Sequence, residues 1–339
     1  MASRQEMADS QDLALREEIA RLETRLAQAK ARLRGGSAAV SAPAADAVAH
    51  RPALTLGPAP SPAALLPFSG ATSTATHFLL LLSDSALPVG AFAFSSGLES
   101  YLAHASSQRR GGATLSSFLP LSLSSFAATT LPFVLAAHRR PADLASLDDQ
   151  LDAAVVCTVG RRASVAQGRA LLGIWERSFR PVLGPREKGG EGTAGDDDGV
   201  AVLRAFASQL RESGPAVAAA SVNGGGGGGD DLDVPPLVAA HLAPLFGAVC
   251  AVVGLTLRQT AYVFMLSHVK ALISAAVRAS MFGPYQAQKV LAGEQVRRMI
   301  DALIEREWDT PVEDAGQSVP VMDLWIGRHE LLYSRIFNS

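Results

Sequence analysis

Three segments of low complexity limit where this chain can build a hydrophobic core. Residues 35–74 are rich in Ala, Pro, Ser and Gly, residues 184–199 are rich in Gly, Glu and Asp, and residues 221–233 contain six consecutive glycines. Segments of this kind bury too little apolar area to offset the entropy lost on ordering. We therefore expect an N-terminal extension at 1–74 and one folded domain at 75–339 that carries two low-complexity insertions.

The rest of the chain has the composition of packed helices. Hydrophobic residues make up 48% of the sequence and aromatic residues only 6%, and Ala and Leu dominate. Ala and Leu favour helices, whereas strands are enriched in β-branched and aromatic residues. We predict an all-α fold in which the domain is a single helical bundle.

Two helices are indicated in the second half of the domain. In the run 255–280, apolar residues recur at steps of three or four, which places them on one helix face. Gly283 is expected to end this helix and Pro284 to begin the next one. In that second helix, Val296, Ile300 and Leu303 mark the buried face.

The N-terminal extension contains a heptad pattern that predicts a short coiled-coil-like helix at about 12–33. Its apolar positions are Leu15, Ile19, Leu22, Leu26, Ala29 and Leu33. In a parallel homodimer Glu18 would face Glu23 and repel it. The alternatives are an antiparallel pairing, a different partner, or a lone helix that packs weakly on its own chain.

Charge and cysteine usage exclude several classes of protein. The formal net charge is −2, so the chain lacks the basic character of a nucleic-acid-binding protein. Cys157 and Cys250 lie among apolar residues and outside any CxxC or Cys/His cluster, which indicates buried thiols in a reducing compartment. The first residues lack a basic stretch followed by an apolar run, so we expect a cytoplasmic protein without a secretory signal.

Two uncharged runs raise the alternative of a membrane-associated helical protein. They span residues 113–137 and 237–257, and the second is long enough to cross a bilayer as a helix. The first contains many Ser and Thr residues and two prolines, and the second lacks flanking Trp or Tyr. We interpret both as buried core helices, with no membrane partner.

The stretch SDSALPVGAFAFSSGLESY, residues 83–101, reads as a corner between two helices. Pro88 prevents the first helix from continuing, and Gly90 permits backbone angles that other residues avoid. Ser96, Gly97 and Glu99 belong to an S-x-x-E pattern, which predicts a capping box at the start of the second helix. The segment is either a structural corner or a binding loop, and the residues favour the corner.

The sequence contains no recognisable catalytic motif. It has no GxSxG, HExxH, P-loop or dinucleotide-binding glycine pattern. His268 lies on an apolar helix face and is interpreted as a core residue, and His241 has no neighbour at metal-ligand spacing. We predict no catalytic, cofactor-binding or metal site and hence no enzyme. An active site assembled from residues distant in sequence remains as a further hypothesis.

Three motifs in the domain resemble the urease accessory protein F (UreF) family. They are SALPVGAFAFSSGLES at 85–100, SAAVR at 274–278, and MDLWIGRHELLYSRIFNS at 322–339. Gly283 and Gln288 fall on family positions between the last two motifs. The segment GPYQAQ is similar to the eukaryotic version of the family, so the resemblance is to a fungal- or plant-like member.

The resemblance implies a function as well as a fold. Members of the family are all-helical, generally dimeric and non-enzymatic. They form a complex with the GTPase UreG and the accessory protein UreD, called UreH in some systems, and this complex delivers nickel to apo-urease. By resemblance, the chain is a scaffold or co-chaperone and a homodimer within the complex. Modulation of GTP hydrolysis is a further expectation, and the partner complex handles nickel and GTP.

The resemblance also points to residues that bind partners. The segment 321–339 is expected to dock onto the UreD-type protein with Tyr333, Arg335 and Phe337 as anchors, because Tyr and Arg are favoured at binding hot spots. The alternative is that this tail packs back on its own core. Arg278 either caps its helix or binds a partner, including as an arginine finger. The other residues assigned by resemblance are Gly283, Gln288, His329, Glu330 and Ser334.

Overall fold

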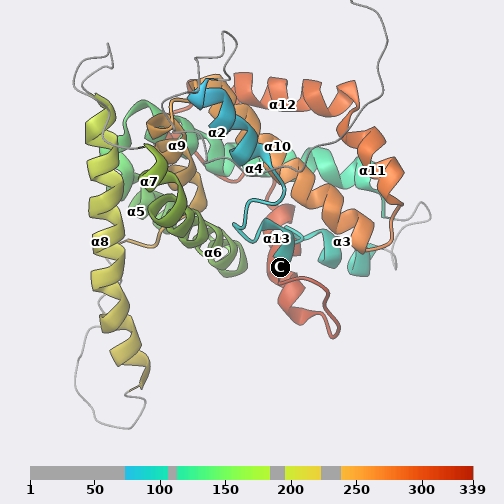
Figure 1. The fold of residues 1–339 in the computed structure, drawn as a ribbon. Helices are drawn as coiled ribbons and strands as arrows, with labels where there is room; N and C mark the ends of the chain where they lie inside the picture. The colour runs from blue at the N-terminus through green and yellow to red at the C-terminus, as the bar shows by residue number, and fades with distance from the viewer. Residues whose placement is uncertain (1–72, 106–112, 184–194, 223–237, 339) are drawn as a thin grey trace, which may run out of the picture. The chain divides into compact units, whose positions relative to one another are not determined.

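The computed structural model describes residues 73–105, 113–183, 195–222 and 238–338, and every regular element in these ranges is a helix (Figure 1). The predicted all-α fold is confirmed. The heptad helix at 12–33 and almost the whole predicted linker lie outside the described residues, and stay predictions.

The α-helices follow one another along the chain with short connections. Their bounds are α2 Thr74–Ser83, α3 Leu98–Ala105, α4 Leu115–Arg139, α5 Leu144–Ala154, α6 Thr158–Ile174, α7 Arg180–Leu183, α8 Gly195–Val222, α9 Leu242–Val252, α10 Leu257–Arg278, α11 Pro284–Leu291, α12 Glu294–Glu307 and α13 Val321–Arg328. A π-helical turn at Trp175–Phe179 joins α6 to α7. Short 3₁₀ turns are η2 Ala91–Ala93, η3 Pro141–Asp143, η5 Val312–Asp314 and η6 His329–Leu331.

Helix α4 lies at the centre of the domain and packs against α9, α10 and α12. Leu123, Leu131 and Leu135 on α4 have no exposed surface. The contact with α9 is close because a Cβ at Gly247 would meet the Val134 carbonyl oxygen at 2.2 Å. A larger residue at Gly247 would therefore push the two central helices apart.

Two helices are long and apolar enough to span a membrane by length and composition alone. They are α4 and α10, and 67% and 61% of their apolar windows are buried inside the domain. Burial of this extent is usual for core helices. The second uncharged run of the sequence, 237–257, contains only the 11 residues of α9 in helical form.

The boundary between α10 and α11 differs from the prediction. Thr256 and Gln259 form a capping box that starts α10. After α10 ends, Ser280 adopts a left-handed conformation with φ +60°. Gly283 has φ −82° and is the N-cap of α11, with Pro284 at its first position. Gly283 therefore starts a helix and does not end one, because Ser280 supplies the left-handed residue.

A second break was not predicted. Gly293 separates α11 from α12, and α12 buries Val296, Ile300 and Ile304, whereas Leu303 is only half-buried.

Helix α8 enters both predicted insertions. It begins at Gly195 and ends at Val222, so the predicted bounds 184–199 and 221–233 are too wide. Gly199 is buried, and a Cβ there would meet the Val252 side chain at 2.7 Å. A glycine that looks like low complexity in the sequence therefore permits close packing of α8 on α9. The remaining insertion residues, 184–194 and 223–233, lie outside the described residues.

The corner between α2 and α3 forms where the sequence predicts it. Helix α2 ends at Ser83, and Gly90 takes a left-handed conformation with φ +76° at the start of η2. The Nζ atom of Lys270 on α10 donates a hydrogen bond to the Ser83 carbonyl oxygen (2.5 Å). This bond ties the corner to a core helix.

Candidate functional site

The carboxylate of Glu99 on α3 binds the C-terminal segment. It accepts hydrogen bonds from the backbone N–H groups of Ile336 (2.7 Å) and Phe337 (3.2 Å). It also pairs with Nε2 of His329 at 2.8 Å, and the His329 side chain is fully buried. Glu99 therefore joins the first motif of the sequence to the last one.

The predicted capping box at Ser96 and Glu99 is wrong. The hydroxyl group that accepts the Glu99 N–H belongs to Ser95 (3.4 Å). Ser96 itself has φ +49° and Gly97 has φ +85°, so both lie in the left-handed turn before α3. The S-x-x-E pattern fails because the carboxylate finds stronger donors in the C-terminal segment.

Gly97 allows α13 to lie close to this turn. A Cβ at Gly97 would stand 3.1 Å from the Ile326 backbone nitrogen and 3.2 Å from Cβ of Trp325. Trp325 also packs against the ring of Tyr101 on α3, with ring centroids 4.8 Å apart. Close packing on both sides fixes α13 and the segment that follows it.

Arg278, the last residue of α10, completes the contact. Its Nη2 donates to the Phe92 carbonyl oxygen (2.5 Å), and its guanidinium lies over the Phe337 ring at 4.3 Å. Its Nε contacts the Ser274 carbonyl oxygen (3.4 Å), as a C-terminal capping cation would. Burial lowers the pKa of Arg278. The guanidinium is thus engaged within its own chain.

We call Glu99, Arg278, His329 and Phe337 the tail latch. The Phe337 side chain is only 5% exposed, and the next residue, Asn338, donates its N–H to the Ala93 carbonyl oxygen (2.8 Å). The assignment of Phe337 as a partner anchor is therefore corrected. In this structure the ring is buried against its own chain, so the alternative of a tail that packs back on its own core describes it.

Other residues of the same segment are exposed. Tyr333 is fully exposed, and Leu324, Leu331 and Ile336 are each more than 60% exposed. Arg335 and Ser334 are exposed as well. Large apolar side chains rarely gather on the surface without a binding role. The latched segment therefore presents an apolar strip, which we define by these four apolar residues.

Glu330 does not belong to the strip. Its carboxylate accepts a hydrogen bond from Arg162 on α6, and this bond lowers the pKa of Glu330. Gly283 and Gln288 lie apart from the latch, exposed on and before α11, and among the described residues neither hydrogen-bonds to the C-terminal segment. Pro88 is exposed in the corner loop.

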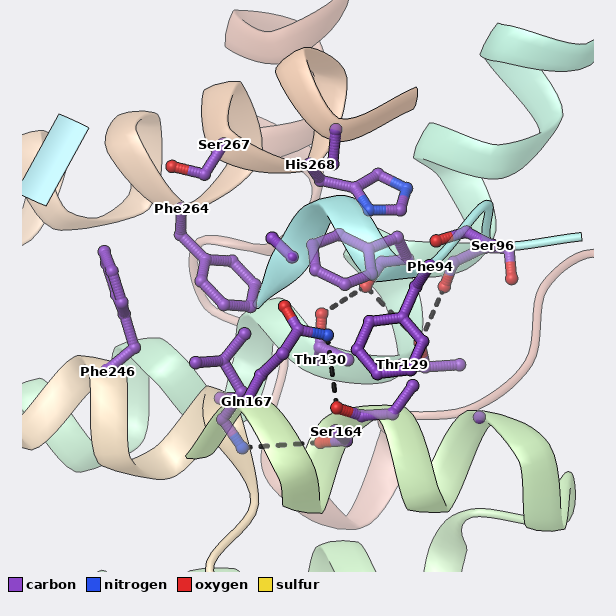
Figure 2. A pocket seen from close by; sticks show the side chains of 18 of the residues that line it. Phe94, Ser96, Thr129, Thr130, Ser164, Gln167, Phe246, Phe264, Ser267 and His268 are labelled. Carbon is purple, nitrogen blue, oxygen red and sulfur yellow. Dashed lines mark hydrogen bonds between the residues drawn. The ribbon is translucent and has the colours of Figure 1, made fainter. Parts of the chain in front are cut away.

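A pocket of about 310 Å³ lies between the corner, α4, α6, α9, α10 and α13. Phe94, Phe246, Phe264 and His268 contribute rings to its wall, and hydroxyl and amide groups lie among them (Figure 2). The polar residues labelled there are Ser96, Thr129, Thr130, Ser164, Gln167 and Ser267. The sequence gave no local signal of this pocket, because its lining comes from segments far apart in the chain.

His268 is a satisfied core residue, as its position on an apolar helix face predicts. Its ring stacks on Phe126 with centroids 3.8 Å apart, and its Nε2 lies 3.1 Å from the Ser122 hydroxyl. Burial lowers the pKa of His268 to about 3. The imidazole is therefore neutral near pH 7.

A buried polar network lies beside the pocket. Asp148 is fully buried and accepts the backbone N–H groups of Ala239, Ala240 and His241. The His241 ring contacts Asp152 and Ser164. The sequence shows no neighbour for His241 at short spacing, because its partners lie on α5 and α6. Only the tertiary fold brings them together.

Metal-binding groups do not gather in the part of the chain that the structure describes. No group of three or more His, Cys, Asp or Glu side chains there has the geometry to hold a metal ion. Cys250 is fully buried, and burial raises the pKa of its thiol. Cys157 is half-buried and lines the pocket, and neither cysteine forms a disulfide.

The fold and this surface define the class of protein. It is an all-α protein whose first conserved-looking corner and C-terminal segment form one joint surface, with an apolar strip exposed beside a buried latch.

Comparison with known proteins then identifies the family. The UreF family matches residues 110–295. A Schizosaccharomyces pombe protein described as an uncharacterized urease accessory protein UreF-like is 33% identical over 268 residues, which cover 79% of this chain and 99% of that protein. The chain belongs to the UreF family.

Plant and other fungal relatives agree. Urease accessory protein F of Oryza sativa subsp. indica is 28% identical over 258 residues, 76% of this chain and 82% of the rice protein. Urease accessory protein 6 of Cryptococcus neoformans is 25% identical over 332 residues, 78% of this chain and 96% of that protein. The resemblance to a fungal- or plant-like member is thus confirmed.

Proposed function

We propose that this chain is a urease accessory protein that acts as a non-enzymatic scaffold. In this proposal it joins a UreG-type GTPase to a UreD-type, or UreH-type, accessory protein so that nickel reaches apo-urease. Membership of the UreF family and relatives named urease accessory proteins support the accessory role. Nickel is the cargo of the complex, and GTP belongs to the GTPase.

The apolar strip is the observation that carries the docking part of the proposal. Tyr333, Leu331 and Ile336 are exposed although the latch orders the backbone that bears them. A pre-ordered backbone lowers the entropy cost of binding, because little has to be immobilised when the partner arrives. The strip is the surface that we assign to the UreD-type protein, with Tyr333 and Arg335 as its anchors.

The latch gives Glu99, Arg278, His329 and Phe337 a positioning role in this proposal. They hold the strip from behind and make no direct contact with the partner. Modulation of GTP hydrolysis then follows from the assembly that the scaffold brings together. An arginine-finger role for Arg278 has no support in the contacts, since its guanidinium is already bound to Phe92 and Phe337.

Size-exclusion chromatography with light scattering tests the proposal directly. The chain is mixed with the cognate UreD-type protein and with UreG loaded with GTP and nickel. We expect co-elution with the native chain and its loss when residues 329–339 are deleted. Tyr333→Ala is expected to weaken binding by about 2 kcal/mol, or about 30-fold in Kd.

Leu331→Ala and Leu80→Ala form a matched pair of controls. Both leucines are exposed, at 77% and 61%, but only Leu331 belongs to the strip. Leu331→Ala is expected to weaken binding, and Leu80→Ala to leave it unchanged. Undiminished co-elution of the deletion variant would refute docking through this segment.

Two further expectations belong to the same proposal. We propose that the chain is a homodimer within the complex and that it works in the cytoplasm. Light scattering on the isolated chain and on the complex reports the subunit count in each state. Fractionation of the native host reports the compartment.

A further inference from the structure

Three side chains from three elements stand in one line beside the pocket. The Ser164 hydroxyl on α6 lies 3.0 Å from Nδ1 of His241, the N-cap residue of α9. Nε2 of His241 lies 2.8 Å from Oδ1 of Asp152 on α5. A nucleophile, a base and a group that orients the base at these distances are the signature of an activated serine.

The charges of this line fix where the protons lie. Although partial burial alone raises the pKa of Asp152, hydrogen bonds from Arg161 and His241 outweigh it and lower this pKa below its usual value. Arg161 donates to both Asp152 oxygens, at 2.6 and 3.0 Å. An ionised carboxylate at Nε2 keeps the imidazole proton there, which leaves Nδ1 to accept the Ser164 proton.

The backbone around His241 is held in place by several independent contacts. Asp148 accepts the N–H groups of residues 239, 240 and 241 at 2.7, 2.9 and 2.6 Å. Ala240 has φ +71°, a left-handed conformation that a residue with a Cβ rarely adopts. Strained backbone of this kind persists where the surroundings over-determine it, and it gathers at functional sites.

Glycine at position 168 permits the close approach. A Cβ at Gly168 on α6 would stand 2.1 Å from the Ala240 carbonyl oxygen. Helix α6 therefore lies directly against the segment that carries the base, and Ser164 stands one turn before Gly168 on the same helix.

Ser164 also borders the pocket of about 310 Å³, which is large enough for a small molecule. The Gln167 side chain follows it by one turn of α6 and lines the same pocket (Figure 2). The Leu242 N–H, at the N-terminus of the 11-residue helix α9, lies 3.4 Å from the Ser164 oxygen. These N–H groups are donors for the oxygen of a carbonyl that Ser164 attacks.

We propose that Ser164, His241 and Asp152 form an acyl-transfer site that hydrolyses small uncharged esters. The aromatic lining favours an uncharged acyl or aryl group. The Ser164 oxygen bonds to the carbonyl carbon as its proton passes to Nδ1 of His241. The ester C–O bond then breaks, and the alcohol leaves with that proton. Water repeats the sequence on the acyl-serine, which releases the carboxylic acid and restores Ser164.

This activity goes beyond the scaffold function and does not depend on it. The residues of the site lie on α5, α6 and the start of α9, and none belongs to the tail latch or the apolar strip. Its failure would leave the docking proposal intact.

A fluorophosphonate probe, which forms a covalent bond with activated serines, tests the proposal on the full chain. Peptide mass spectrometry of the folded native protein is expected to place one phosphonyl group on Ser164. Hydrolysis of p-nitrophenyl butyrate is measured in parallel. Ser164→Ala is expected to abolish the labelling and to lower the hydrolysis rate about 100-fold. Asp152→Asn is expected to slow both, because it leaves the base with the wrong tautomer.

Ser267→Ala is the matched control. Ser267 lines the same pocket on α10, and it has no contact with His241. This variant is expected to keep both the labelling and the hydrolysis. Native protein that stays unlabelled at Ser164 overturns the proposal, and so does hydrolysis that survives in Ser164→Ala. The labelling map of the native chain decides the matter even where a variant fails to fold.

Discussion

At the scale of the residue, the molecule depends on carboxylates that bind backbone N–H groups. Glu99 takes two such groups from the C-terminal segment, and Asp148 takes three from residues 239–241. A carboxylate with several N–H donors is well satisfied even where water is excluded. Each of these side chains thereby orders a segment that has no regular structure of its own.

Replacement of Glu99 by Ala is expected to release the C-terminal segment. The donors at Ile336, Phe337 and His329 would lose their shared acceptor, at a cost of about 1–3 kcal/mol. Hydrogen exchange measured by mass spectrometry should become faster across residues 329–338. Glu305→Ala removes an exposed carboxylate on α12 that pairs with Arg258 and serves as control. Unchanged exchange in Glu99→Ala would show that Phe337 holds the segment alone.

Gly168 and Gly173 offer a sharp comparison on one helix. A Cβ at Gly168 meets backbone at 2.1 Å, whereas a Cβ at Gly173 meets nothing within 4 Å. Gly168→Ala is expected to lower the free energy of unfolding by about 2 kcal/mol or more, because backbone atoms must move. Gly173→Ala is expected to raise it by up to about 1 kcal/mol through helix propensity. Urea unfolding measures both, and equal effects would contradict the close approach of α6 to residue 240.

At the scale of the element, helix ends decide how the domain is divided. The sequence predicts α10 well because Thr256, Gln259 and the apolar face are local signals. It misplaces the end of α10, since glycine is the usual left-handed residue and Ser280 takes that role here. It also misses the start of α8, because Gly199 looks like part of a low-complexity run and is in fact buried against Val252.

The left-handed Ser280 leads to a prediction about stability. Ser280→Gly is expected to raise the free energy of unfolding by about 0.5–1 kcal/mol, because glycine adopts φ +60° without strain. Ser274→Gly lies inside α10 and is expected to lower it by a similar amount. Thermal unfolding of both variants checks the pair. A loss of stability in Ser280→Gly would mean that the serine side chain contributes more than its backbone costs.

At the scale of the whole molecule, the predicted fold class is confirmed, and long-range contacts explain what the sequence could not provide. Helix propensity and apolar spacing are local, so an all-α domain follows from them. Glu99 was misread because a local pattern competed with partners at the other end of the domain. Ser164, Asp152 and His241 were not joined, since no spacing rule relates residues on three separate elements.

The buried imidazole of His268 makes the stability of the domain depend on pH. Its pKa is about 3 in the folded chain and 6.5 in the unfolded one, so the unfolded state binds the proton more readily. The contribution is fully present above pH 6.5 and is lost as pH falls from 6.5 toward 3. Melting temperatures across this range are expected to fall less steeply in His268→Gln. Burial also lowers the pKa of His138, so some slope remains.

The bond between Glu99 and Ile336 closes a loop across 237 positions of the chain. The entropy cost of closing a loop grows only with the logarithm of its length, so that doubling the length adds about 0.6 kcal/mol. Both low-complexity insertions fall inside this loop. Insertions and deletions in them therefore change the closure by little, and evolution can lengthen or shorten these segments while the two distant motifs keep their contact.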